Sequence, residues 1–297
     1  MRVTAVVLSW NGREDTLACL ESLARIETDG VATVVVDNGS TDGSPEAIEE
    51  RFPEVELIRA GVNLGYAAGN NVGIRRALDG GADWVVLVNN DATVAPDLVD
   101  ALVAAAGRHP DAGALAGKVY VDEPRDVIWY AGGNFEPRLG YSGRVRGAGK
   151  HDDGSYDEER DVDWGTGALL AVSRAAIDRV GLLDEELFAY LEDVDWCLRI
   201  RDVDLRVVFV PSARAWHRVS ASTGGAASTT SLYYHCRNTL AVCERRLPLT
   251  RGHTGVRRTA IVGAHLAQAL GHSKRRAALW TVIRAWRDYR RGRMGRR

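Results

Sequence analysis

The chain has 297 residues, enough for one large α/β domain or two closely packed halves around a sizeable core. Its apolar fraction of 45% and charged fraction of 26% are those of an ordinary globular protein, and they exclude a disordered or fibrous chain. The net charge of −2 conceals a segregation: residues 245–297 contain fifteen Lys or Arg and one acid, so residues 1–244 carry −16.

The sequence also bears on location. Four scattered cysteines without a CxxC pair are typical of a reducing compartment and predict buried thiols. The N-terminus leads into a short apolar strand and not into a signal peptide, and no stretch approaches the roughly 18 apolar residues of a membrane span. We expect a cytoplasmic protein, with peripheral contact to the inner face of the cell membrane left open.

Strand-like and helix-like patterns alternate through the first third of the chain. Apolar runs rich in β-branched residues indicate strands that are covered on both faces. The predicted strands are residues 3–8, 33–36, 55–58 and 84–88, and the predicted helices are residues 16–24, 45–51, 67–78 and 96–107. This alternation predicts an α/β fold with a parallel, Rossmann-like sheet and right-handed crossovers.

The second half is less regular. Residues 132–163 are rich in Gly and charge and are expected to be mostly loop, and such a segment inside a compact domain is often used for binding. Helices are predicted at residues 175–180 and 192–201, and a strand at 206–210 that ends at Pro211. A Gly, Ala, Ser and Thr stretch at 220–231 precedes a helical C-terminal part.

Three polar clusters follow predicted strands: Ser9-Trp10-Asn11, Asp37-Asn38-Gly39-Ser40 and Asn89-Asn90-Asp91. One such cluster alone is usually a turn or a helix cap. Ligands of parallel α/β sheets bind at the carboxyl ends of the strands, so three clusters at neighbouring ends predict a shared pocket. A Gly-rich loop at 63–71 could hold an anion or a ribose, although it matches neither GxGxxG nor a P-loop.

Two further features lie in the second half. Glu192, Asp193 and Asp195 fall at a predicted helix start, where charge compensation of the helix dipole is the simpler interpretation and a general base is the functional one. His217 would be a metal ligand only if Asp91 lies nearby. A divalent ion on phosphate oxygens typically needs only one or two protein ligands.

Taken together and in this order, the motifs resemble those of family two glycosyltransferases, in particular the rhamnosyltransferase-like members that build bacterial surface polysaccharide. The resemblance extends over about residues 3–247. It is carried by VVDNGSTDGS at 35–44, NLGY at 63–66, LVNND at 87–91, GLLDE at 181–185, YLEDVD at 190–195, and Tyr233-Tyr234 with Arg237-Asn238. The family implies a GT-A fold, with a donor-binding half at 1–120, an acceptor-binding and catalytic half at 121–243, and a basic helical extension at 244–297.

The resemblance also implies roles for individual residues. Trp10 would stack on the nucleobase of a dTDP- or UDP-sugar, Asp37 would accept its imide proton, and Asp193 would be the catalytic base. The donor-binding residues would be Ser9, Trp10, Asp37, Asn63, Gly65, Asn71 and Asn90. Trp164, Gly165 and Glu192 would contact the acceptor, and Asp91 and His217 would hold Mg²⁺ or Mn²⁺. The family usually has Asp-x-Asp at the metal, whereas Asn89 here supplies a neutral amide, which lowers the expected metal affinity.

The resemblance therefore predicts an inverting, metal-dependent transfer of a sugar, with dTDP-rhamnose as the first choice of donor and UDP-hexoses as rivals. The acceptor would be a glycan, a lipid-linked saccharide or a small molecule. A catalytically inactive sugar-nucleotide or glycan-binding protein is the alternative from another class. A sugar nucleotidyltransferase would need a basic Gly-rich loop near the N-terminus, where residues 9–14 offer only Arg13.

The basic C-terminal part contains one amphipathic pattern. Residues 275–291 place Leu279, Val282, Ile283, Trp286 and Tyr289 on one helical face, with Arg on the other. Such a helix suits the surface of an anionic membrane, or its apolar face packs on the acidic body of the protein. Both interpretations stay open from the sequence, and no motif supports nucleic-acid binding.

Overall fold

The computed structural model describes residues 1–28, 30–135, 143–218 and 228–297. Its elements in chain order are β1 (Val3–Ser9), α1 (Arg13–Leu23), β2 (Val31–Asp37), α2 (Ser44–Arg51), β3 (Glu56–Arg59), α3 (Tyr66–Asp79), β4 (Trp84–Asn89), β5 (Ala92–Val94), α4 (Leu98–Arg108), β6 (Ala112–Val121), β7 (Ile128–Tyr130), β8 (Gly133–Phe135), β9 (Gly143–Val145), β10 (Arg160–Asp161), β11 (Leu169–Ser173), α5 (Arg174–Val180), the 3₁₀ turn η1 (Glu185–Leu187), α6 (Glu192–Asp202), β12 (Arg206–His217), α7 (Thr229–Arg246), α8 (Arg251–Leu270) and α9 (Arg275–Arg290). All strands and helices predicted in the first third are present.

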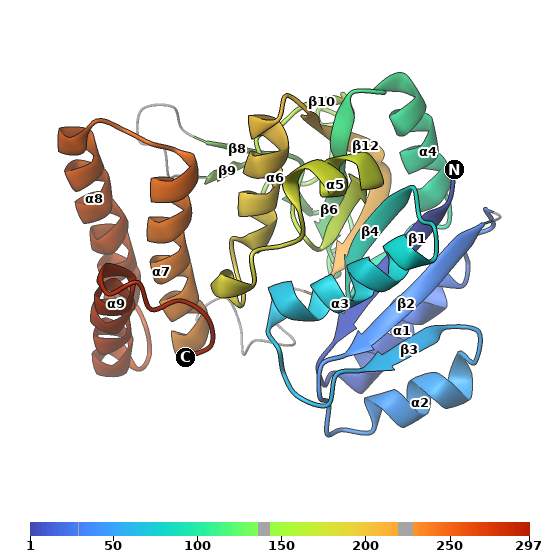
Figure 1. The fold of residues 1–297 in the computed structure, drawn as a ribbon, viewed down its shortest axis with the longest axis horizontal. Coiled ribbons are helices and arrows are strands. Elements are labelled where there is room, and N and C mark those ends of the chain that lie inside the picture. The colour runs from blue at the N-terminus through green and yellow to red at the C-terminus, as the bar shows by residue number, and fades with distance from the viewer. Residues whose placement is uncertain (29, 136–142, 219–227) are drawn as a thin grey trace.

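One large sheet forms the centre of the molecule, with strand order β10-β12-β6-β11-β4-β1-β2-β3 (Figure 1). The strands β3, β2, β1 and β4 are parallel, as the alternation of strands and helices predicts. β11 runs antiparallel between β4 and β6, and this change of direction was not predicted. Every residue of β11 is buried, so this strand is covered on both faces.

Helix α3 lies very close to the parallel part of the sheet, and two glycines make this approach feasible. A Cβ at Gly69 would lie 2.5 Å from the side chain of Leu8, and one at Gly73 would lie 2.4 Å from Val6. This packing brings the loop before α3 to the carboxyl ends of the parallel strands, where ligands of such sheets bind.

The predicted end of a strand at Pro211 is wrong, because β12 continues to His217. Its pairing with β6 jumps from Val210 opposite Gly117 to Arg214 opposite Lys118, so the residues between form a bulge. Proline lacks an N–H and is tolerated in a sheet at such a bulge. The continuation matters because it carries His217 past the bulge toward the end of β4.

The segment at 132–163 is largely irregular as expected, but it contains the short strands β8, β9 and β10. Residues 136–142 of this segment, and residues 220–227 of the small-residue stretch, lie outside the described part of the chain. All four cysteines are buried and free, as predicted.

The three C-terminal helices form a layer of their own at one end of the molecule, with α6 between them and the sheet (Figure 1). The apolar face of α9 packs against this helical layer, with Ala278, Val282 and Ala285 fully buried. Packing on the protein therefore accounts for most of the predicted amphipathic face, while Ile283 stays 43% exposed. In the described ranges, no helix has the length and apolar character required to cross a membrane.

Candidate active site

A cavity of about 1120 Å³ opens at the carboxyl ends of the parallel strands and extends to α6 and α7. Nine of the thirteen residues predicted for the site line it: Trp10, Asn63, Gly65, Asn90, Asp91, Trp164, Glu192, Asp193 and His217. They come from both halves of the chain, so the tertiary fold assembles one cavity from separate motifs.

The other four predicted residues are not among the described side chains that line the cavity. Ser9 is fully buried and shares a hydrogen bond of 3.1 Å with Thr16, whose hydroxyl also accepts one from Asn90. The Asp37 carboxylate accepts the backbone N–H groups of Gly39 and Ser40. In this structure both residues shape the loops behind the cavity wall.

Asn71 and Gly165 also have structural partners. The Asn71 amide donates to Leu183 O and to Glu185 Oε1, and it accepts from the Leu183 N–H. Gly165 donates its N–H to the thiol of Cys197. Their predicted direct contacts with donor and acceptor stay predictions, and the bonds of Asn71 show how it ties α3 to the turn before η1.

Gly65 combines a cavity position with a backbone requirement. Its φ is +90°, and a Cβ there would lie 2.5 Å from the ring of Phe188. The neighbouring Asn63 side chain accepts the Gly65 N–H at 2.8 Å and fixes this loop. Only glycine allows the loop before α3 to approach residue 188 so closely.

Sheet pairing brings Asp91 and His217 together. β5 pairs antiparallel with β12 so that His217 lies opposite Ala92, the residue after Asp91. Asp91 Oδ1 and His217 Nε2 are 2.9 Å apart, yet their orientation makes no hydrogen bond and Oδ1 has no partner among the described residues. Two ligands at about 2.1 Å from one octahedral ion are separated by about 3.0 Å, so this spacing fits a shared cation.

Buried polar atoms without a partner concentrate here. Of eight such side-chain atoms in the described residues, four belong to residues that line the cavity: Asp91 Oδ1, Trp164 Nε1, Glu192 Oε2 and His217 Nδ1. Unsatisfied buried polar atoms are rare in folded proteins and call for a ligand, an ion or water. Among the described residues no third His, Cys, Asp or Glu joins Asp91 and His217, so the donor's phosphates would have to complete the coordination.

Asn89 stands where the family usually has an acidic residue. Its Oδ1 lies 3.0 Å from the hydroxyl of Tyr66, and its Nδ2 is 3.3 Å from His217 Nε2. Burial, followed by the charges of Glu192 and Asp193, raises the pKa of Tyr66 well above its ordinary value, so this hydroxyl stays a donor. Tyr66 was part of a quoted motif but received no role from the sequence.

Asp193 lies at the start of α6 with its carboxylate held by the opposite loop. Its Oδ2 accepts the Gly167 N–H at 2.9 Å, and its Oδ1 accepts the Val194 N–H at 2.8 Å. Burial raises the pKa of Asp193, while these two backbone bonds act in the opposite direction. A carboxylate in a cavity with raised proton affinity suits a general base.

Glu192 differs from its neighbour. Burial, and then the charge of Asp193, raises the pKa of Glu192 well above the usual carboxyl range. Two like charges this close disfavour joint ionisation, so Glu192, whose pKa is raised further, is the first of the two to take up a proton. Asp195, the third acid of the cluster, is paired with Arg199 and Arg246 and has a structural role.

The loop before α6 is held in an unusual conformation. Phe188, Tyr190 and Leu191 all have positive φ, at 64°, 70° and 71°, which is costly for side chains of this size. The fully buried Asn238 of α7 donates from Nδ2 to three carbonyls of this loop, those of Leu187, Ala189 and Tyr190, at 2.8–2.9 Å. The motif Arg237-Asn238 was recognised in the sequence, but only the folded structure shows that Asn238 holds this loop.

The last residues of the described chain also reach the cavity, which sequence reasoning missed. The Gly295 N–H donates to Glu186 O at 2.6 Å, and the buried Arg237 donates to Gly295 O at 2.7 Å. Arg296 and Arg297, which follow, line the cavity wall. No sequence pattern identifies such a return, because it depends on the packing of α7 against α9.

Comparison with known proteins places this geometry in a family. The profile of glycosyl transferase family 2 matches residues 4–170. The chain is 36% identical over 226 residues to an N-acetylglucosaminyl-diphospho-decaprenol L-rhamnosyltransferase of Mycobacterium tuberculosis, covering 69% of this chain and 72% of that protein. It is 24% identical over 217 residues to the dTDP-rhamnosyl transferase RfbF of Shigella flexneri, covering 73% and 69%.

Solved structures agree on the fold. A mannosyltransferase from Pyrobaculum calidifontis in complex with GDP-Man and Mn²⁺ superposes with a TM-score of 0.59 at 20% identity, covering 98% of this chain and 75% of that one. GalNAc-T7 with UDP, GalNAc and Mn²⁺ superposes with a TM-score of 0.67 at 14% identity, covering 98% and 56%. The fold is therefore GT-A, and the chain is a glycosyltransferase that belongs to glycosyl transferase family 2 and resembles its rhamnosyltransferases.

Proposed function

We propose that this protein transfers rhamnose from dTDP-rhamnose to a hydroxyl of a lipid-linked saccharide, with inversion at the anomeric carbon and with a divalent metal ion. The observation that carries the mechanism is that Asp193 shares one cavity with the pair Asp91 and His217. The choice of donor and acceptor rests on the activities of the relatives in Mycobacterium tuberculosis and Shigella flexneri.

Asp91 and His217 are the residues that would hold Mg²⁺ or Mn²⁺. The support is their spacing of 2.9 Å without a hydrogen bond, and the unsatisfied Asp91 oxygen. Such an ion supplies electrostatic stabilisation of the negative charge that develops on the leaving diphosphate. The exposed ring of Trp10, at 40%, is free to stack on the base of the nucleotide.

In the reaction, Asp193 takes the proton of the acceptor hydroxyl. The hydroxyl oxygen forms a bond to the anomeric carbon while the bond from that carbon to the phosphate oxygen breaks, and the nucleoside diphosphate leaves. The Gly167 N–H keeps the carboxylate oriented during this transfer. Protonated Glu192 is available as a hydrogen-bond donor to the acceptor, since its Oε2 has no partner among the described residues.

Cytoplasmic location at the inner face of the membrane is part of the same proposal, because nucleotide sugars and lipid-linked acceptors meet there. The deciding experiment incubates the purified protein and Mn²⁺ with dTDP-rhamnose or UDP-hexoses and a synthetic sugar-diphosphate lipid, followed by mass spectrometry of the lipid. We expect rhamnose on the lipid only from dTDP-rhamnose. Transfer from a UDP-hexose would replace the donor assignment, and nucleotide binding without any transfer would favour an inactive binding protein.

A further inference from the structure

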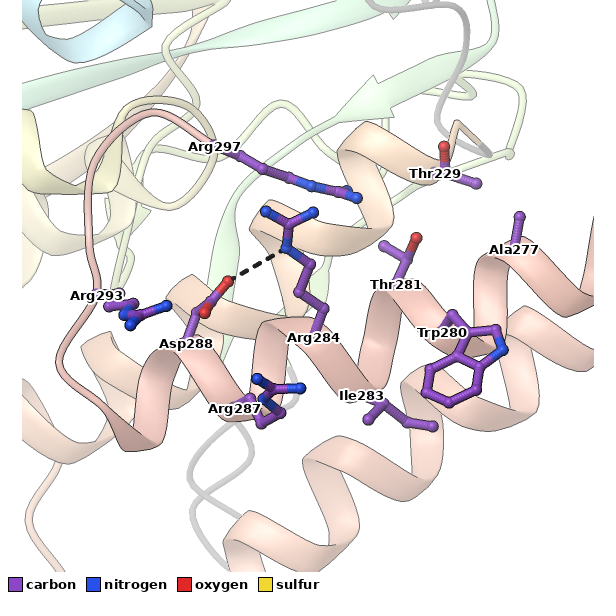
Figure 2. A pocket seen from close by; sticks show the side chains of 10 residues that line it. All are labelled: Thr229, Ala277, Trp280, Thr281, Ile283, Arg284, Arg287, Asp288, Arg293 and Arg297. Atoms are coloured by element: carbon purple, nitrogen blue, oxygen red, sulfur yellow. Dashed lines mark ion pairs between the residues drawn. The ribbon is translucent and has the colours of Figure 1, made fainter.

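A second pocket, separate from the donor-binding residues, lies on the surface of α9. Its volume is about 620 Å³, and it is lined by Arg284 and Arg287 of α9 and by Arg293 and Arg297 of the tail that follows (Figure 2). Four cations face one acid, Asp288, whose carboxylate accepts the Tyr233 hydroxyl at 2.8 Å and pairs with Arg284 at 3.6 Å. The pocket therefore keeps a positive charge of about +3, counted from these side chains.

The arginines are available for a ligand. Within the described ranges, the side chains of Arg287 and Arg293 take part in no ion pair. The guanidinium of Arg297 lies 4.9 Å from the centre of the Tyr233 ring, and its backbone N–H donates to the Tyr234 hydroxyl. Guanidinium groups bind phosphate oxygens through two parallel hydrogen bonds, which makes such a cluster selective for phosphates. A diphosphate, with charge on two neighbouring groups, matches several arginines around one pocket.

The opposite end of the pocket is apolar and exposed. Trp280 is 70% exposed and Ile283 is 43% exposed, and Figure 2 shows both on the side away from Arg293. Of eight large hydrophobic side chains that the described residues expose, five lie beyond residue 248, on or next to α8 and α9: Leu249, Val256, Leu270, Trp280 and Ile283. An exposed apolar surface beside a basic pocket suits an amphiphilic ligand.

The pocket adjoins the catalytic cavity. Thr229, the first residue of α7, and Arg297 line both spaces. A ligand whose diphosphate lies among the arginines can therefore extend a sugar past Thr229 toward Asp193, while its apolar chain leaves over Trp280.

We propose that the pocket on α9 binds the diphosphate of the acceptor, with the long apolar chain of that acceptor contacting Trp280 and Ile283. One part of this proposal, that the sugar of the ligand points toward Asp193, rests on the proposed transfer to a lipid-linked saccharide. The binding step itself requires no donor, no metal and no turnover, so it is tested on its own.

The test measures binding of farnesyl diphosphate by titration calorimetry in EDTA, which keeps diphosphate from binding through metal at Asp91. The variant Arg287→Glu with Arg293→Glu is compared with Arg275→Glu with Arg276→Glu, a matched control that changes the net charge of the protein equally at the start of α9, outside the pocket. We expect the first pair to weaken binding at least about tenfold and the control to stay within about twofold. Equal weakening by both pairs, or no binding to the unmodified protein, overturns the proposal.

Two further arms identify the source of the phosphate. Trp280→Ala should weaken farnesyl diphosphate severalfold and leave inorganic pyrophosphate unchanged. Pyrophosphate that binds as tightly as farnesyl diphosphate would show a site for free phosphate and overturn the lipid assignment. Titration of all variants with dTDP and UDP in the presence of Mn²⁺ checks that they are folded. If the unmodified protein bound neither nucleotide, that result would count against the proposed function and not against this pocket.

Discussion

The two ends of the catalytic cavity are supported in different ways. Asp91 follows β4, in the middle of the sheet, and strand pairing alone brings His217 opposite its neighbour. Asp193 follows a loop with three positive φ angles, which Asn238 of α7 holds through three carbonyls. The proposed metal end thus depends on sheet register, while the proposed base end depends on side chains of a distant helix, chiefly the buried amide of Asn238.

This difference indicates which end of the cavity a mutation can displace more easily. A paired strand resists displacement because its whole ladder of hydrogen bonds would have to shift. A strained loop relaxes when a single restraining contact is lost, because its conformation is not intrinsically favoured. We therefore expect mutations at the base end to act through structure as well as chemistry, and those at the metal end to act through charge alone.

The largest expected effect is that of Asp193→Asn. The amide keeps the shape of the side chain but cannot accept a proton, so turnover should fall by about two to four orders of magnitude. Steady-state rates with saturating donor measure it, and nucleotide affinity by calorimetry should stay unchanged. Turnover near that of the unmodified protein would reject Asp193 as the base.

Asp91→Ala should remove donor binding that depends on metal. The carboxylate supplies the only formal charge of the pair with His217, so nucleoside diphosphate affinity in Mn²⁺ should fall at least about tenfold, to its value in EDTA. The same titration in EDTA serves as the control, because metal-free affinity should not change. An Mn²⁺ effect of the same size in the variant would place the ion elsewhere.

Asn238→Ala tests the support of the base end. Loss of the amide leaves buried carbonyls without a partner, which should cost about 1–3 kcal/mol of unfolding free energy and lower turnover, with metal-dependent nucleotide binding retained. Arg257→Ala is a matched control, since this buried arginine also donates to main-chain carbonyls, those of Cys243 and Leu247, at the C-terminal end of α7. It should lose stability without losing turnover per folded molecule. An equal loss of turnover in both variants would mean that α7 acts only through overall stability.

The smallest effect on rate should come from Glu192→Gln, because the glutamine resembles the protonated side chain. Turnover should fall by less than about tenfold, far less than for Asp193→Asn. The raised pKa of Glu192 means that ionisation opposes folding, so stability declines as pH rises from the ordinary carboxyl range through the raised pKa. The variant avoids this decline, and thermal unfolding should show it gaining stability over the unmodified protein as pH rises. A constant difference at all pH values would show that folding does not raise the pKa of Glu192.

The pH dependence of turnover offers a second readout on the same pair. Asp193 must be ionised to accept a proton, and its raised pKa moves the acid limb of the rate profile above the ordinary range of an aspartate. If turnover fell only at pH values below the ordinary pKa range of an aspartate, the result would contradict the buried environment of the Asp193 carboxylate.

The sequence predicted most reliably those features that depend on residues close together in the chain. Apolar strands and the polar residues that follow them identified the parallel sheet and its carboxyl edge, and the motifs around Asp37, Asp91 and Asp193 pointed to the family. The antiparallel strand β11 was missed because its residues 169–172 are all apolar, and the direction of strand pairing cannot be read from such a run. The strand end placed at Pro211 was wrong because a bulge three residues long cannot be seen in a pattern.

The sequence by itself determined the class of fold, the family and the residue types available for the reaction, because these depend on periodicity and on short contiguous motifs. Only the tertiary structure decided that His217 reaches Asp91, that Asn238 holds the loop before Asp193, and that Arg297 joins the cavity to a basic pocket. Each of these contacts joins residues more than forty positions apart. The distance in space between these residues is set by sheet register and helix packing, which the local sequence does not encode.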